Sequence, residues 1–359
     1  MAKIDQFLKV LVEQGGSDLH LTVGSPPVMR VHGNLQRVKF REMSNADMEA
    51  LVYEIMEEEW RITFMDQLDY DFAYEIEGLA RFRVNVFWQR KGLAVVMRTI
   101  PSKILTVDEL NMPEVVRKMC MLTKGLVLVT GPTGSGKSTT LAAMVDLIND
   151  TRTDHILTIE DPIEFVHSNK KALINQREIR TNTKSFANAL RAALREDPDV
   201  IMVGEMRDRE TIELGITAAE TGHLVFGTLH TSSAPKTVDR IIDVFPADEQ
   251  EQIRSMLSES LKGVIAQVLL RAKDGKSRMA AWEIMVGTAA IANLIRENKV
   301  HQIPSIIQTG RKDGMQLLDQ HILEFLMSGK ITPEEAYMKA NNKQAFLQHL
   351  KEGPPEEFV

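Results

Sequence analysis

Cysteine is almost absent from this sequence. The 359 residues contain a single one, Cys120, so neither a disulfide within the chain nor a zinc site built from several cysteines is possible. We therefore interpret Cys120 as a small side chain that packs on one face of a helix.

Long hydrophobic runs are also missing. No apolar stretch approaches the roughly 18–20 residues that a helix needs to cross a bilayer. Near the N-terminus, Asp5, Lys9 and Glu13 interrupt the apolar residues, which differs from the basic and then apolar pattern of a secretory signal. We expect the protein to stay in the cytoplasm.

The chain has no excess of basic residues. Its formal net charge is −7, whereas a general nucleic-acid binder usually carries a basic footprint. The hydrophobic share of 43% and the charged share of 26% are typical of a globular protein. A chain of 359 residues is long enough for two domains.

One stretch, residues 131–138, carries a specific chemical signal. Its sequence GPTGSGKS fits G-x-x-x-x-G-K-[ST], the phosphate-binding loop of NTPases. Glycines let backbone N–H groups crowd around phosphate oxygens where a Cβ would obstruct them. Lys137 is expected to reach the β- and γ-phosphates, and the Ser138 hydroxyl to bind Mg²⁺. The nucleotide-binding residues predicted here are Gly131, Pro132, Thr133, Gly134, Ser135, Gly136, Lys137, Ser138 and Thr139.

The surroundings of this loop support the prediction. Residues 126–130 form a short apolar run, which is typical of a fully buried strand. After the loop, apolar residues recur at helical spacing, and the N-terminus of the predicted helix would add its dipole to the anion site. These apolar residues are Leu141, Met144, Val145 and Ile148.

The pattern of the chain divides it into two domains. Residues 1–100 read as a small α+β domain, with a Ser44-capped helix running to about Glu59, and residues 101–113 read as a linker. From residue 114, apolar strands alternate with helices, as in parallel α/β proteins; the strands are predicted at 125–130, 155–160, 200–204 and 223–229. Beyond about residue 247 the pattern is mostly helical, with one apolar stripe that predicts a helix over 253–264.

Three further segments follow predicted strands, at the edge where an open α/β sheet binds its ligands. The first contains the carboxylates of Glu160, Asp161 and Glu164, which are suited to Mg²⁺ or to polarising a water. In the second, Glu205 follows an apolar strand, and Gly204 stands where NTPases commonly have an aspartate. In the third, two histidines bracket a buried strand, and Thr228 is expected on its γ-phosphate side. These histidines are His223 and His230.

Arginines gather on one predicted face of the first domain. In residues 81–87, period-two alternation buries Phe82, Val84 and Val86 and leaves Arg81 and Arg83 on the opposite face. Arg98 lies on the next predicted strand. Solvated surface arginines are the simpler interpretation of this pattern.

Four segments together resemble a known family. They are similar to the Walker A, Asp box, Walker B and His box of the secretion-type ATPases of bacterial pili and type II secretion. The segments are GPTGSGKST, TIEDPIEF, LREDPDVIMVGEMRD and TAAETGHLVFGTLHT. The resemblance covers nearly the whole chain and is greatest to the family's pilus-retraction ATPases. It includes residues 15–21, 26–31, 80–85, 279–283 and 290–297, although the family usually has an arginine where this chain has Ala292.

The resemblance implies a fold and an activity. It implies a PAS-like N-terminal domain, a RecA-like P-loop ATPase domain with a helical C-terminal portion, and a homohexamer that hydrolyses ATP with Mg²⁺ to power type IV pilus retraction and twitching motility. The implied partners are an inner-membrane pilus platform protein and a paralogous retraction ATPase, at the cytoplasmic face of the inner membrane, with no nucleic acid.

The resemblance also implies roles for particular residues. Glu205 is expected to position or activate the attacking water, and Glu160 to support Mg²⁺ or its water, although the two roles are interchangeable on this reasoning. The arginines at 81, 83 and 98 would approach the nucleotide phosphates as the domains close. Ser138, Glu160 and Glu205 are the expected Mg²⁺ site.

Other functions remain open at this point. An accessory retraction ATPase fits the region 315–349. Extension and secretion ATPases of the family generally carry a four-cysteine zinc insertion and a longer N-terminal region, so the single cysteine and the roughly 100 residues before the expected ATPase domain count against them. A RecA-like nucleic-acid translocase would share the phosphate loop but predicts a basic channel. A nucleotide sensor without hydrolysis would not need both glutamates and both histidines.

Overall fold

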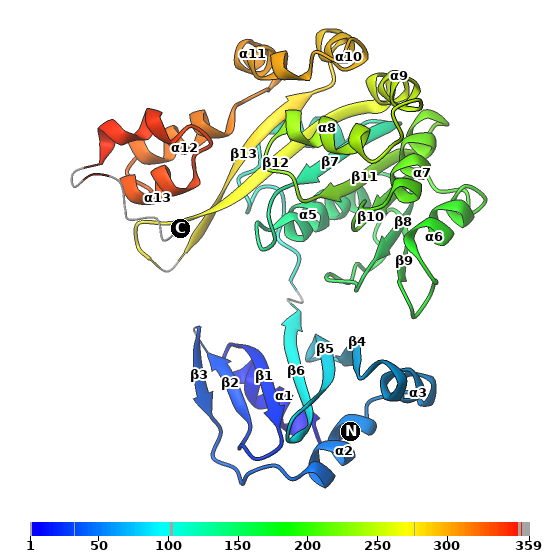
Figure 1. Ribbon diagram of the computed structural model, residues 1–359, viewed down its shortest axis with the longest axis vertical. Helices are drawn as coiled ribbons and strands as arrows, with labels where there is room; N and C mark the ends of the chain where they lie inside the picture. The colour runs from blue at the N-terminus through cyan, green and yellow to red at the C-terminus, as the bar shows by residue number, and fades with distance from the viewer. Residues whose placement is uncertain (1, 32, 101–102, 276, 351–352, 354–359) are drawn as a thin grey trace. The chain divides into compact units, whose positions relative to one another are not determined.

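The computed structural model describes residues 2–31, 33–100, 103–275, 277–350 and 353 (Figure 1). Contacts divide the chain into two compact units. Unit 1 comprises Met1–Lys103 together with Pro162–Val166, and unit 2 comprises Ile104–Asp161 together with His167–Val359. The first two residues of the predicted linker, 101 and 102, lie outside the described residues. Further along that segment, Val107 and Met112 are buried in a core of unit 2.

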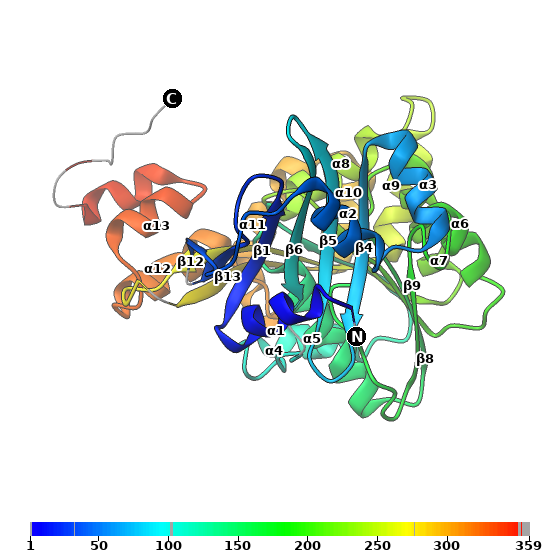
Figure 2. The same cartoon turned by 90° about the horizontal axis from the view of Figure 1, so that it is seen from below.

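Unit 1 contains a six-stranded antiparallel sheet in the order β3-β2-β1-β6-β5-β4. Three helices pack on one face of this sheet through a shared apolar core (Figure 2). The helices are α1 (Asp5–Glu13), α2 (Asn45–Tyr53) and α3 (Glu58–Gln67). The strands are β1 (Gly16–Thr22), β2 (Val28–Val31), β3 (Asn34–Arg37), β4 (Asp69–Ile76), β5 (Ala80–Gln89) and β6 (Gly92–Ile100).

Local sequence signals explain much of unit 1. Alternation along β5 buries Phe82, Val84 and Val86 completely and leaves the arginines on the other face. The predicted cap of α2 is confirmed, because the Ser44 hydroxyl accepts a hydrogen bond from the backbone N–H of Asp47 in a capping box. The prediction of one helix up to about Glu59 was wrong: α2 ends at Tyr53, and a second helix begins at Glu58.

Unit 2 contains a seven-stranded sheet in the order β13-β12-β7-β11-β10-β8-β9, parallel except for β13. Its strands are β7 (Gly125–Thr130), β8 (His155–Glu160), β9 (Leu173–Glu178), β10 (Val200–Val203), β11 (Leu224–Leu229), β12 (Leu261–Arg271) and β13 (Arg278–Val286). Its α-helices are α4 (Glu114–Cys120), α5 (Lys137–Thr151), α6 (Phe186–Ala193), α7 (Arg209–Glu220), α8 (Ala234–Asp243), α9 (Gln250–Ser260), α10 (Ala289–Arg296), α11 (Ile303–Thr309), α12 (Leu318–Met327) and α13 (Pro333–Lys339). The short 3₁₀ turns are η1 (Val300–Gln302), η2 (Gly310–Asp313) and η3 (Lys343–His349).

Both faces of the central strands β7, β10 and β11 are buried, which explains why these strands are continuous apolar runs. Successive side chains of a strand point to opposite faces. Along β7, Leu126 and Leu128 enter a core shared with α6 to α11, whereas Val127 and Val129 enter the core shared with α4 and α5. Cys120 ends α4 inside this second core, where burial raises the pKa of its thiol to about 12.

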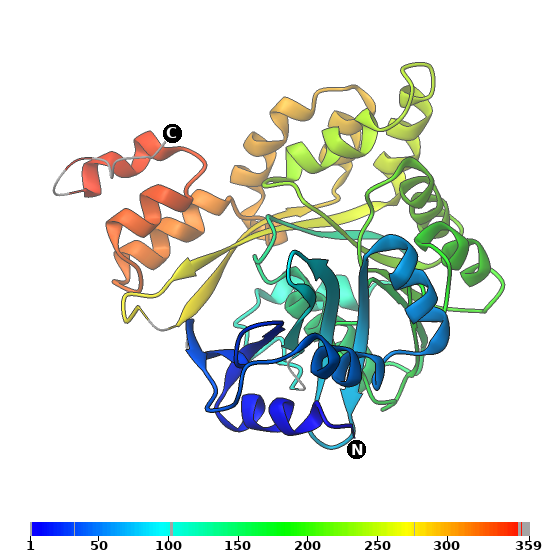
Figure 3. The ribbon, with the colours of Figure 1, turned by 60° about the horizontal axis from the view of Figure 1, so that its bottom comes forward.

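The segment beyond residue 247 contains a long antiparallel hairpin that the sequence pattern did not indicate. The apolar stripe over 253–264 predicted one helix, but α9 ends at Ser260 and β12 begins at Leu261. Pairing of β12 with β7 on one side and with β13 on the other overrides the helical spacing here. The far end of this hairpin carries α12 and α13, drawn in orange and red in Figure 3.

A partly buried histidine, His321, joins β13 to these last helices. The ring Nδ1 of His321 accepts hydrogen bonds from the backbone N–H of Trp282 at 3.1 Å and from Nε2 of Gln316 at 3.0 Å. Because both partners are donors, Nδ1 must be unprotonated. Burial accordingly lowers the pKa of His321 from its usual 6.5. Over the described part of the chain, the helices are too short or too polar to cross a membrane.

We predict that His321 makes the protein less stable in mild acid. The imidazole of His321 binds a proton less readily in the folded protein than in the unfolded chain. The stability that neutral His321 contributes is therefore complete above pH 6.5 and is lost as the pH falls below that value. His321→Asn should supply a similar acceptor without titrating. Melting temperatures should therefore fall a few degrees less between pH 7.5 and pH 5.5 in this variant than in the wild type. Equal falls in both proteins would contradict the prediction.

Candidate nucleotide-binding site

The loop 131–136 connects β7 to the first residue of α5, as the sequence predicted. Three glycines adopt positive φ angles that other residues rarely adopt: 148° at Gly131, 76° at Gly134 and 89° at Gly136. At Gly131 the space is also closed, since a Cβ would lie 2.3 Å from the carbonyl oxygen of Gln267 on β12. The loop therefore needs its first glycine for both reasons.

Lys137 is folded back over this loop. Its Nζ donates hydrogen bonds to the carbonyl oxygens of Gly131 at 3.0 Å and Pro132 at 3.2 Å. No side chain among the described residues caps the N-terminus of α5, which begins at this lysine. The first N–H groups of this helix and its positive dipole end are therefore oriented for an anion beside the lysine. Ser138 and Thr139 follow in the first turn.

Parallel pairing brings three further strand ends to the edge that carries the loop. Leu229 of β11 pairs with Thr130 of β7, and β10 lies between β11 and β8 in register. The residues that follow these strands are therefore neighbours, although more than 40 positions separate Glu160 from Glu205 in the sequence. This arrangement is the one that the three strand-end motifs predicted.

Glu205 is held by two cationic or polar neighbours at this edge. Its Oε1 lies 2.8 Å from Nε2 of His230 and also forms an ion pair with Arg207. Gly204 precedes it in the place of the usual aspartate, where a Cβ would lie 3.2 Å from the carbonyl oxygen of Ile159. A side chain at residue 204 would thus press on the neighbouring strand β8.

Glu160 ends β8 and is almost buried, with 8% of its surface exposed. Its Oε1 accepts hydrogen bonds from Oγ1 of Thr158 at 2.8 Å and from Nε2 of Gln176 at 3.1 Å. Gln176 lies on β9, and its own Oε1 accepts the backbone N–H of His167. The sequence analysis missed Gln176, because a polar residue on an edge strand carries no motif.

His223 does not join this group, whereas the roles of Asp161 and Glu164 stay predictions. His223 precedes β11, so it lies at the opposite end of that strand from His230, roughly 20 Å away at about 3.3 Å per residue. Its Nδ1 lies 3.0 Å from the carbonyl oxygen of Ala218. Asp161 lies 3.8 Å from Arg180, and Glu164 belongs to unit 1.

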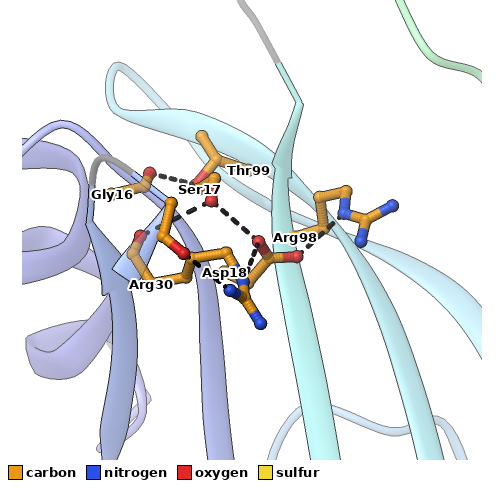
Figure 4. A network of polar contacts seen from close by, with 7 residues as sticks. Gly16, Ser17, Asp18, Arg30, Arg98 and Thr99 are labelled. Carbon is orange, nitrogen blue, oxygen red and sulfur yellow. Dashed lines mark hydrogen bonds and ion pairs between the residues drawn. The ribbon is translucent and has the colours of Figure 1, made fainter. Parts of the chain in front are cut away.

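In unit 1, Arg98 is anchored by a buried acid. Its Nε donates to Oδ1 of Asp18 at 2.8 Å, while 70% of the arginine side chain is exposed (Figure 4). Figure 4 shows the two terminal nitrogens of Arg98 on the side of the guanidinium away from Asp18. Burial raises the pKa of Asp18, but hydrogen bonds from Arg98 and Ser17 outweigh it and lower the pKa below its usual value. Asp18 therefore stays charged and fixes the direction of Arg98.

The other two arginines lie on the same sheet. Arg83 pairs with Arg98 across β5 and β6, and Arg81 pairs with Ile100 one step further along. Their guanidinium groups lie 3.9 Å from acids of β4, namely Asp71 for Arg83 and Glu75 for Arg81. The three arginines thus share one face of unit 1, as the strand alternation predicted.

Comparisons with known proteins agree with this arrangement. The family described as type II/IV secretion system protein matches residues 1–354. The chain is 56% identical to the type IV pilus retraction ATPase PilT of Pseudomonas aeruginosa, over 96% of this chain and 99% of that protein. It is 56% identical to a twitching motility protein of Neisseria gonorrhoeae, over 89% of this chain and 85% of that one. The type IV pilus ATPase PilU of P. aeruginosa is 40% identical, over 98% of this chain and 92% of its own length.

A solved structure extends the similarity to three dimensions. A crystal structure of the pilus retraction motor PilT with bound ADP matches with a TM-score of 0.90 and 47% identity, covering 96% of this chain and 99% of that one. The match over nearly the full length includes both the antiparallel sheet of unit 1 and the P-loop sheet of unit 2. This chain belongs to the type II/IV secretion system protein family.

Proposed function

We propose that this protein is a hexameric ATPase that powers the retraction of type IV pili. The observation that carries the proposal is the phosphate loop with Glu205, His230 and Glu160 at one sheet edge, in a chain that is 56% identical to PilT over 96% of its length. Retraction is preferred to an accessory role because identity to PilU is 40%.

The phosphate loop supplies the binding chemistry. Backbone N–H groups of the loop and of the first turn of α5 hold the phosphates, and Lys137 exchanges its carbonyl partners for the β- and γ-phosphates. The buried hydroxyl of Ser135 has no partner among the described residues, which suits a loop that awaits phosphate oxygens.

Mg²⁺ would be held mainly by the nucleotide. Among the residues described, no group of three or more histidine, cysteine, aspartate or glutamate side chains is placed to hold a metal. Mg²⁺ in such sites usually takes substrate phosphates, waters and only one or two protein ligands. Ser138 fits that donor set, with Glu160 and Glu205 behind the metal-bound waters; when bound, the ion neutralises charge that develops on the phosphates.

Hydrolysis needs a base or a positioning group for water. Glu205 takes this role, because its carboxylate is partly exposed at 23% and is oriented by His230. Glu160, nearly buried and doubly hydrogen-bonded, takes the supporting role toward Mg²⁺. Arg81, Arg83 and Arg98 supply positive charge to the transferring phosphoryl group when the site closes.

The remaining proposals concern the assembly. The protein acts as a homohexamer at the cytoplasmic face of the inner membrane, through the pilus platform protein and beside a paralogous retraction ATPase, and it does not bind nucleic acid. Stimulation of the ATPase by DNA or RNA would favour the translocase alternative instead. A role in extension or type II secretion is the alternative within the family.

Deletion of the gene tests the proposed function directly. We expect excess surface pili and no twitching, with motility restored by the wild-type gene but not by Lys137→Ala. The purified variant should lose ATP hydrolysis by at least about 100-fold, because the loop loses the cation that reaches the phosphates. Lys124→Ala, an exposed lysine ahead of β7, is the matched control and should keep full turnover. Loss of pili in the deletion strain would favour extension, and near-normal turnover of a folded Lys137→Ala would refute the assignment of the loop.

The two glutamates are separated by charge-removing substitutions. Glu205→Gln keeps its shape, so it should bind ATP with near wild-type affinity and hydrolyse it about 100-fold more slowly. Glu160→Gln should raise the Mg²⁺ concentration needed for half-maximal turnover more than Glu205→Gln does. The reverse outcome would exchange the two roles, and unchanged turnover in both variants would exclude them.

Arg98 is predicted to act mainly on turnover. Arg98→Ala should lower kcat at least tenfold, since an arginine finger is worth about 10³ or more in related phosphoryl transfers, whereas the melting temperature should fall by only a few degrees, because Asp18 loses one of its hydrogen-bond donors. Arg37→Ala, on strand β3 of the same sheet, is the control. Equal turnover in both variants would show that Arg98 has no role in hydrolysis.

A further inference from the structure

One buried amide contacts the phosphate loop from an adjacent strand. Gln267 lies on β12, which pairs with β7 beside the loop, and only 2% of its surface is exposed. Its Nε2 donates to the carbonyl oxygen of Ser135 at 2.6 Å, and its Oε1 accepts from Oγ1 of Thr140 at 2.8 Å. A single side chain therefore bridges the loop and the first turns of α5.

Both ends of this amide have fixed roles. The Ser135 carbonyl can only accept, so it must face the NH₂ group, and the Thr140 hydroxyl then donates to the amide oxygen. The backbone carbonyl of Gln267 also fills the space beside Gly131, where a Cβ would approach within 2.3 Å. One residue of a neighbouring strand thus contacts the first and fifth residues of the loop and the first turn of α5.

Strand β12 continues from Gln267 into an apolar cluster that it shares with the C-terminal helices. Three residues beyond Gln267, Leu270 is fully buried in a cluster with residues of α12 and α13. The next residue, Arg271, donates its backbone N–H to Oε1 of Glu335 on α13 at 2.9 Å. Residues 267–271 of β12 thus contact the loop at one end and α13 at the other.

We propose that Gln267 is a positioning residue that holds the phosphate loop in its phosphate-binding shape and connects the loop to the C-terminal helices through β12. This inference rests on the proposed nucleotide binding at the loop. The glutamine itself does not touch the reacting atoms. It orients the N–H groups of the loop that contact the phosphates, and through β12 it couples the conformation of the loop to α13.

The test replaces Gln267 by methionine, which keeps the length and removes both hydrogen bonds. The Kd for ADP should rise about tenfold, because two buried groups lose their partners, whereas the Kd for AMP, which lacks the β-phosphate that the loop cradles, should change less than about threefold. The control is Gln316→Met, because Gln316 donates to the Trp282 carbonyl at 2.9 Å away from the loop. A structural defect alone would lower stability in both variants without changing the ratio of the ADP and AMP affinities.

Three results would overturn the inference or separate it from the proposed function. An unchanged ADP to AMP ratio in Gln267→Met would refute the positioning role; should that variant not fold, Thr140→Val provides the same test on the other half of the bridge. Hydrogen exchange in α13 should slow when ADP binds the wild type, and an absence of slowing would refute the connection through β12. Failure of the wild type to bind ADP would instead refute the proposed function.

Discussion

The whole site depends on parallel strand pairing in unit 2. Register between β7, β11, β10 and β8 brings the carboxyl ends of all four strands to one edge, and each end carries a polar group of the site. The backbone N–H groups of a glycine loop, an imidazole and two carboxylates become neighbours without any of them being near in sequence. Backbone hydrogen bonds between strands therefore set the separations that phosphoryl transfer requires.

Neighbouring polar groups give the two glutamates different environments. Glu205 is partly exposed and accompanied by Arg207 and His230, whereas Glu160 is nearly buried and bonded to two neutral donors. Charged and titratable side chains lie beside Glu205, whereas hydrogen bonds from Thr158 and Gln176 fix the direction of Glu160. These surroundings, and not the identical side chains, are the basis for the different roles that we propose for the two acids.

The arginine face of unit 1 follows a related logic. Asp18 accepts a hydrogen bond from Nε of Arg98, so the terminal nitrogens of the guanidinium point away from this acid. A long flexible side chain is thereby partly ordered, which would reduce the entropy lost in the phosphate contact that we propose for it. Together with Gln267 in unit 2, this pair shows polar residues that act by orienting others.

The sequence by itself determined the local features. Spacing within 131–138 defined the loop, strand alternation placed Arg81 and Arg83 on the polar face, and Ser44 marked a helix start, because each depends only on residues a few positions apart. Tertiary structure decided the rest. It turned residues 261–264 into a strand by pairing them with β7, and it brought Gln176 and Gln267 to the site. These outcomes depend on partners from distant parts of the chain, and no local pattern encodes such partners.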